Sequence, residues 1–316
     1  MINTFPNGVW PVMLTPFTKE NEVDYETLSG LIDWYMQRGV SGLFAVCQSS
    51  EMFELTREER EKIASFVKNQ VNGKIPVIAS GHVSDDFGEQ LKDVVGMAKQ
   101  GVDAVVLITN RLAKEAESDE VWKRNTENLL KHIPEDISLG LYECPFPYKR
   151  IMSPELLKWC AETGRFYFLK DTSCDIGNIK AKLEAVEGTQ LKIYNANSAT
   201  LLESIKLGAA GYSGIMANFH PELYVWLLKN WHSNLELAES LENFLSISSL
   251  IEKQMYPANA KYSLTLDGLT CGLYTRTQDY RQFSLTNQLE INQLYALSNQ
   301  YKKMVLTPKC HQQERK

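Results

Sequence analysis

The chain has 316 residues, of which 44% are hydrophobic and 23% are charged, a composition typical of a soluble globular protein. The formal net charge of −6 and the isoelectric point near 5.5 argue against nucleic acid or an anionic membrane surface as the main partner. No apolar run is long enough to span a bilayer. Residues 1–6 contain no basic region followed by an apolar core, so we expect a cytoplasmic protein without a signal peptide.

Cysteine and histidine residues are dispersed along the chain. The cysteines form no C-x-x-C pair, and no two histidines stand at the helical spacing of metal ligands. The sequence therefore predicts reduced thiols, no metal site and no cofactor. The residues concerned are Cys47, Cys144, Cys160, Cys174, Cys271, Cys310, His82, His132, His220, His232 and His311.

Short apolar runs alternate with amphipathic helical patterns up to about residue 220. The expected strands are 8–14, 42–46, 75–79, 104–108, 138–142, 166–169, 191–194 and 211–215. Capping signals at Asp24, Thr56 and Ser153 open three of the intervening helices. Eight strands alternating with helices predict the α/β class, as a closed (β/α)8 TIM barrel. The alternative is a doubly wound open sheet, which favours a Gly-rich phosphate loop after the first strand, and this chain has none there.

The pattern changes to helices between about residues 221 and 301, with a break at Met255-Tyr256-Pro257. We expect three regions. Residues 1–230 form the catalytic barrel, residues 231–306 form a C-terminal helical extension, and the polar residues 307–316 form a disordered tail.

The run from Phe166 to Thr172 is the most informative stretch. Four apolar or aromatic residues precede Lys170, as in a strand buried on both faces. Lys170 then lies at the carboxyl end of the strand, where barrel enzymes carry their chemistry. A lysine among apolar neighbours has a lowered pKa and becomes a nucleophile towards carbonyl groups. The alternative is a lysine that ends its strand and extends into water.

Other polar residues are expected at neighbouring strand ends, where a barrel brings them to one mouth. They are Thr15, Tyr142 and the run Gln48-Ser49-Ser50-Glu51. Together these motifs resemble those of the pyruvate-dependent class I lyase superfamily of dihydrodipicolinate synthase and N-acetylneuraminate lyase. The resemblance extends over nearly the whole chain to about residue 300. Its further segments are Gly8 to Phe17, Ile75 to Ala79, Tyr142-Glu143-Cys144-Pro145 and Leu169-Lys170-Asp171-Thr172.

The resemblance implies a role for each matching position. Lys170 would form a Schiff base with the keto carbon of pyruvate or another 2-oxo acid, and Tyr142 would be the general acid and base. Ser49, with the backbone N–H groups of Ser49 and Ser50, would bind the substrate carboxylate. The remaining expected substrate-binding residues are Gln48, Thr15, Gly214, Ile215 and Glu143.

The chain departs from the family's dihydrodipicolinate synthases at three places. The segment 109–112 has no tyrosine for the proton relay between subunits, and Pro147 stands where those synthases have an arginine. Gln48 replaces the small hydroxyl residue of the relay, and Cys47 and Ser50 replace glycines. Lys149 or Arg150 could take over the missing arginine's task. Glu143 replaces asparagine and would contact a sugar-like polyol or pair with Arg111 or Lys149.

The sequence therefore predicts a Schiff-base lyase, either an aldolase or a dehydratase, acting on pyruvate, a 2-keto-3-deoxy sugar acid or a related 2-oxo acid. Synthesis of dihydrodipicolinate is disfavoured. The alternatives are a non-catalytic keto-acid or sugar-acid binding protein of the same fold, and an unrelated barrel enzyme with a structural Lys170. The resemblance also implies a homo-oligomer, either a tetramer or a dimer.

Overall fold

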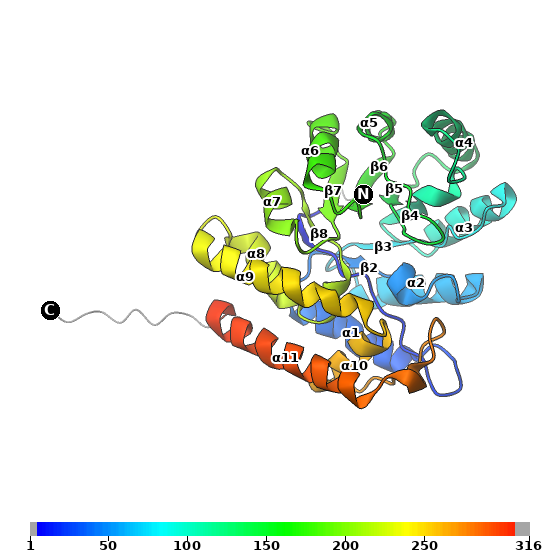
Figure 1. The fold of residues 1–316 in the computed structure, drawn as a ribbon. Helices are drawn as coiled ribbons and strands as arrows, with labels where there is room; N and C mark the ends of the chain where they lie inside the picture. The colour runs from blue at the N-terminus through cyan, green and yellow to red at the C-terminus, as the bar shows by residue number, and fades with distance from the viewer. Residues whose placement is uncertain (1–4, 307–316) are drawn as a thin grey trace.

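The computed structural model describes residues 5–306, and these contain one parallel sheet of eight strands (Figure 1). The strands follow the order β1-β8-β7-β6-β5-β4-β3-β2, and a parallel bridge from Val12 to Phe44 joins the chain after β1 to β2. The sheet thus curls back on its own first strand, which confirms the predicted (β/α)8 barrel. The strands are β1 Gly8–Val9, β2 Leu43–Phe44, β3 Val77–Ala79, β4 Ala104–Ile108, β5 Leu139–Tyr142, β6 Phe166–Asp171, β7 Lys192–Asn195 and β8 Gly211–Tyr212.

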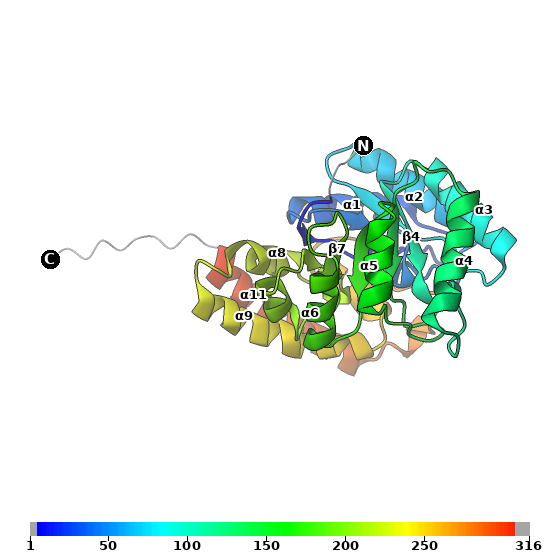
Figure 2. The same cartoon turned by 90° about the horizontal axis from the view of Figure 1, so that it is seen from above.

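The strands alternate with the helices that surround the sheet (Figures 1 and 2). Their capping matches the sequence: the Thr56 hydroxyl accepts from the Glu59 N–H at 3.1 Å, and the Glu59 carboxylate accepts from the Thr56 N–H at 2.9 Å. The helices are α1 Tyr25–Gln37, α2 Arg57–Val71, α3 Phe87–Lys99, α4 Asp119–His132, α5 Pro154–Glu162, α6 Ile176–Ala185, α7 Leu201–Lys206 and α8 Pro221–Asn230.

Aromatic side chains fill the barrel interior beneath the carboxyl ends of the strands. The Phe168 ring stacks on Tyr194 with centroids 4.3 Å apart and lies 5.3 Å from Trp10. Because side chains alternate along a strand, Phe168 and Lys170 point to the same side of β6. The aromatic layer therefore lies next to Lys170 on the inside of the barrel.

A close backbone approach joins β1 to β8. A Cβ atom on Gly211 would lie 1.9 Å from the carbonyl oxygen of Gly8, so this contact requires a glycine. The join positions β8 and the loop after it, which carries Gly214 and Ile215.

The chain continues into the predicted helical extension, formed by α9 Leu235–Ser248, α10 Ala258–Leu266 and α11 Leu285–Leu306. The predicted break at 255–257 separates α10 from a short 3-10 helix, η4 Ser249–Lys253. The expectation of helices alone is wrong for 267–284, which is irregular apart from one short turn, η5 Tyr280–Gln282. The predicted tail at 307–316 lies outside the described residues. None of the helices described is both long and apolar enough to cross a membrane.

Distant contacts fix the irregular segment. The Glu51 carboxylate accepts the backbone N–H groups of Arg276 at 2.6 Å and Thr277 at 2.9 Å. The Arg276 guanidinium donates to both oxygens of Glu59 at 2.8 Å. These partners are more than 200 residues away in the chain, so local sequence patterns do not reveal them.

Candidate active site

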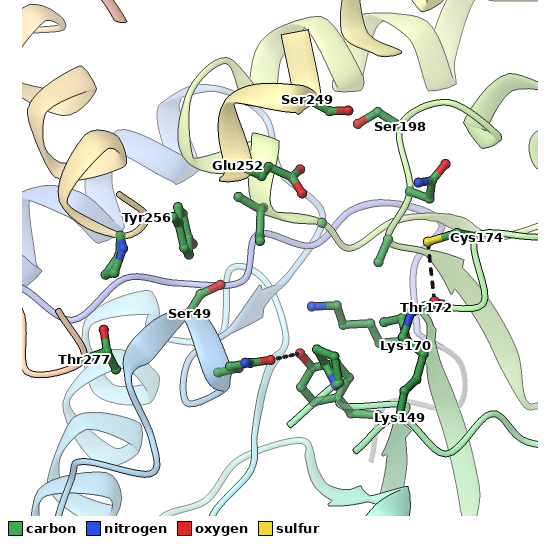
Figure 3. Close-up of a pocket in the computed structure, with 18 of the residues that line it drawn as sticks. Ser49, Lys149, Lys170, Thr172, Cys174, Ser198, Ser249, Glu252, Tyr256 and Thr277 are labelled. Carbon is green, nitrogen blue, oxygen red and sulfur yellow. Dashed lines mark hydrogen bonds between the residues drawn. The ribbon is translucent and has the colours of Figure 1, made fainter. Parts of the chain in front are cut away.

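A pocket of about 390 Å³ opens at the carboxyl ends of the strands (Figure 3). Its walls come from both the barrel and the extension. Of the residues expected from the sequence, the pocket brings together Gln48, Ser49, Tyr142, Lys170, Gly214 and Ile215.

Lys170 lies on β6, directly beside Tyr142 of β5 in the register of the sheet. Its side chain is only 4% exposed, and its Nζ atom lies 4.4 Å from the centroid of the Tyr142 ring. Burial lowers the pKa of Lys170, and the thiols of Cys47 and Cys144 partly oppose this shift. A larger fraction of the lysine is therefore free amine at a given pH than in water.

Tyr142 is also buried, and its hydroxyl donates to Oε1 of Gln48 at 3.2 Å. Burial raises the pKa of Tyr142 well above its ordinary value. The phenol therefore stays protonated at neutral pH and is a possible proton donor beside Lys170.

Gln48 and Ser49 belong to a single 3-10 turn, η1 Gln48–Ser50. Two expected binding residues support this turn instead of lining the pocket. The Thr15 hydroxyl donates to the carbonyl oxygen of Ser50 at 2.9 Å, and the Ser50 hydroxyl bonds the carbonyl groups of Met13 and Ala45. The Ser50 N–H donates to the Cys47 carbonyl at 3.0 Å. The structure thus gives Thr15 and Ser50 a bracing role, because their polar groups already have partners within the loop.

Gly214 and Ile215 lie on the wall after β8. A Cβ atom on Gly214 would lie 2.3 Å from the Tyr212 hydroxyl oxygen and 2.5 Å from the Ala196 carbonyl oxygen. This position therefore requires a glycine, because any side chain would collide with Tyr212 and with the backbone after β7.

Glu143 does not line the pocket, contrary to the sequence prediction. It directly follows Tyr142, the last residue of β5, and its side chain points to the opposite side, towards α6. Its buried carboxylate pairs with Lys182 of α6 and accepts the Thr172 N–H at 2.9 Å. Lys182 also bonds Asp171 at 2.6 Å. The expected pairing with Arg111 or Lys149 is therefore wrong as well. Burial and the Asp171 carboxylate raise the pKa of Glu143 to about 7.

The two candidate cations after β5 differ in position. Lys149 reaches the rim of the pocket, where its Nζ donates to the Thr172 carbonyl at 2.9 Å. Arg150 turns away and bonds Asp119 at 2.8 Å. Arg111 pairs with Asp85 at 2.7 Å. Of Lys149, Arg150 and Arg111, Lys149 is thus the residue that lines the pocket.

Sequence reasoning missed the part of the wall that the extension contributes. Four of these residues are Glu252, Tyr256, Thr277 and Gln278. They follow the last strand by 40 residues or more, and although Tyr256 lies in the predicted break at 255–257, no local pattern places any of the four at the pocket. Within residues 5–306, no group of three or more His, Cys, Asp or Glu side chains is arranged to hold a metal ion.

Fold and pocket place the chain among the (β/α)8 barrel proteins whose sites lie at the carboxyl ends of the strands. The model of the dihydrodipicolinate synthetase family matches residues 5–293, so the chain belongs to this family. The 4-hydroxy-tetrahydrodipicolinate synthase of Methanococcus maripaludis strain S2 is 30% identical over 222 residues, which are 70% of this chain and 74% of the relative. The synthase of Bacillus velezensis is 28% identical over 264 residues, which are 82% of this chain and 89% of the relative.

Solved structures show the same fold. A prophage protein of the dihydrodipicolinic acid synthase family from E. coli K12, solved in complex with pyruvate, has a TM-score of 0.81 and 22% identity, with 94% of this chain and 98% of that chain covered. Dihydrodipicolinate synthase from Thermotoga maritima has a TM-score of 0.82 and 20% identity, with 93% and 99% covered.

Proposed function

We propose that this protein is a Schiff-base-forming lyase, an aldolase or dehydratase that acts on pyruvate or a 2-keto-3-deoxy sugar acid. One observation carries the proposal: the Lys170 amine is buried at the pocket against the ring of Tyr142. Membership of the dihydrodipicolinate synthetase family, and relatives named as synthases of this type, support a lyase.

The proposed chemistry begins with attack of the neutral Lys170 amine on the keto carbon of the substrate. Loss of water leaves an iminium ion. When the carbon next to the iminium carbon loses its bond to the following atom of the substrate, the iminium ion accepts the electron pair of that bond. The Tyr142 phenol donates the proton with which the carbinolamine oxygen leaves as water. In an aldol cleavage the resulting phenolate then takes the proton from the substrate hydroxyl group next to the breaking bond, and the phenol is restored. Ser49 and the backbone at Gly214 and Ile215 hold the substrate carboxylate end.

We further propose that the product is not dihydrodipicolinate. The segment 109–112 offers no tyrosine, and the Asn110 amide there is occupied by the carbonyl groups of Cys144, Phe146 and Tyr148. Among residues 5–306, no arginine lines the pocket. The pocket therefore lacks the strongest partner for a second carboxylate.

Intact-mass spectrometry after incubation with pyruvate and borohydride tests the proposal. We expect one reduced pyruvyl adduct on the wild-type protein and none on Lys170→Ala. Lys149→Ala is the matched control, because it removes the other lysine of the pocket and should leave the adduct intact. Absence of an adduct with pyruvate and with a panel of 2-oxo acids would contradict the proposal and favour a protein that only binds keto acids.

A further inference from the structure

Glu252 is a pocket carboxylate to which the proposed chemistry assigns no task. It lies on η4 of the extension and extends toward the space above Lys170 (Figure 3). It makes no hydrogen bond or ion pair with another side chain within residues 5–306. Glu51, the other acidic residue of the lining, is fully engaged: it pairs with Lys261 at 3.1 Å and accepts the Thr277 N–H at 2.9 Å. Glu252 is therefore available to a ligand.

Uncharged hydrogen-bonding groups surround this carboxylate. Ser249 precedes it on η4, and Ser198 lies across from Ser249 on the loop after β7 (Figure 3). The Ser249 hydroxyl donates to the Ser246 carbonyl at 2.7 Å, so its oxygen remains an acceptor. Asn197 also lines the pocket and accepts from the Thr200 N–H through Oδ1 at 3.1 Å, and its amide N–H groups donate to no group within residues 5–306. Such a wall suits a chain of hydroxyl groups.

The charges of the pocket are unevenly placed. Lys149 and Glu252 lie on opposite sides of Lys170 in Figure 3. Lys149 is exposed, and its ammonium group donates to the Thr172 carbonyl. Burial raises the pKa of Glu252 to about 7, against the opposing effect of the Lys170 ammonium. Above pH 7 this group is mainly a carboxylate, which with so little solvation gains from hydroxyl donors and repels a second carboxylate.

We propose that Glu252 is a specificity-determining residue that accepts hydrogen bonds from hydroxyl groups at the far end of the substrate. The substrate is then a 2-oxo acid with a neutral polyol end, and one with a second terminal carboxylate is disfavoured. This inference rests on the proposed Schiff-base function, because Lys170 fixes the other end of the substrate.

Two sugar acids test the proposal, since they share a carbon chain and differ only at the last carbon: 2-keto-3-deoxygluconate ends in a hydroxymethyl group and 2-keto-3-deoxyglucarate ends in a carboxylate. Each competes with isotopically labelled pyruvate for Lys170, so the concentration that halves formation of the labelled pyruvyl adduct reports its binding. The label separates the added pyruvate from any pyruvate that cleavage of the sugar acid releases. At about pH 8, where the ionised form of Glu252 predominates, we expect the wild type to favour the gluconate. Glu252→Gln should reduce this preference roughly tenfold or more, because it removes the charge and keeps the shape.

Two further variants sharpen the result. Glu252→Asp keeps the charge and should retain much of the preference, whereas Glu290→Gln removes an exposed carboxylate of α11 and should change nothing. Three results would overturn the inference: equal competition by the two acids in the wild type, competition by neither acid, or an unchanged preference in Glu252→Gln. Each of them would leave the lyase proposal standing as long as the pyruvyl adduct still forms. Absence of the pyruvyl adduct in every protein, wild type included, would instead overturn the proposed function, and this inference with it.

Discussion

At the scale of single residues, the pocket depends on which side of its strand each side chain occupies. Lys170 shares the inner side of β6 with Phe168, so the aromatic layer limits the water that reaches its amine. Tyr142 and Glu143 are adjacent in sequence, yet one faces the pocket and the other faces α6. A shift of one residue along either strand would exchange these environments.

The burial of Lys170 predicts the pH dependence of imine formation. An ammonium ion cannot attack a carbonyl, so formation rises with pH as the lysine loses its proton. Because burial lowers the pKa of Lys170 from 10.5, half-maximal formation should occur below pH 10.5. The measurement is the initial rate of adduct trapping by cyanoborohydride across pH, with a lysine-containing model peptide, whose pKa is about 10.4, as control. A midpoint equal to that of the peptide would show that burial does not activate the amine.

Tyr142 should be required for bond cleavage but not for attachment of the substrate. Tyr142→Phe removes the phenolic proton and keeps the ring that lies against Lys170. We expect turnover of the cleaved substrate to fall by roughly 10²–10⁴-fold, the usual contribution of a positioned acid or base. The pyruvyl adduct should still form. Turnover close to the wild-type rate would assign the proton transfer to another group.

At the scale of elements, a buried ionic cluster joins α6 to the ends of β5 and β6. Lys182 bonds the carboxylates of both Glu143 and Asp171, and all three side chains are inaccessible to solvent. Each carboxylate belongs to the residue that follows Tyr142 or Lys170 in the chain. The cluster therefore holds the two strand ends that carry the proposed chemistry.

Lys182→Met should destabilise the protein strongly, because it leaves two carboxylates buried without a counter-charge. Loss of one partner of a buried ion pair costs about 3–5 kcal/mol of unfolding free energy. Lys180→Met on the same helix is the control, since its pair with Glu184 is exposed and should contribute about 1 kcal/mol or less. Urea denaturation measures both. Similar losses for the two variants would mean that the cluster contributes no special stability.

At the scale of the whole molecule, the extension completes the pocket. We propose that residues 1–230 form the barrel and 231–306 the extension, and that the two unfold together. Two contacts join them deep in the structure: the buried pair of Lys261 with Glu51, and the Tyr256 hydroxyl, which accepts from the Asn218 amide at 2.9 Å. The predicted homo-oligomer stays a prediction.

Joint unfolding can be measured with two signals. Five of the six tryptophans lie within residues 1–230 and the sixth is Trp231, the first residue of the extension, so their fluorescence reports mainly the barrel. Circular dichroism at 222 nm reports the helices of both regions. We expect the two urea transitions to coincide, because detachment of the extension would leave Glu51 buried without Lys261. A dichroism transition at a lower urea concentration than the fluorescence transition would show that the extension unfolds separately.

The barrel and the Lys170–Tyr142 pair were predictable from the sequence because their signals are local. Apolar runs, capping residues such as Asp24 and Thr56, and a lysine after four apolar residues depend on short stretches of chain. Glu143 shows the limit of this reasoning. Its partner Lys182 is 39 residues away on a helix, and no local pattern favours it over nearer cations such as Lys149.

The sequence by itself determined the eight-fold alternation of strands and helices, because backbone periodicity and burial follow from residue order. It also determined that a lysine and a tyrosine end neighbouring strands. Tertiary structure alone decided how the far end of the pocket is built. Glu252, Tyr256 and Thr277 reach it only because the extension packs back across the barrel mouth. Such contacts join segments far apart in the chain, and their free energy depends on packing that no local pattern encodes.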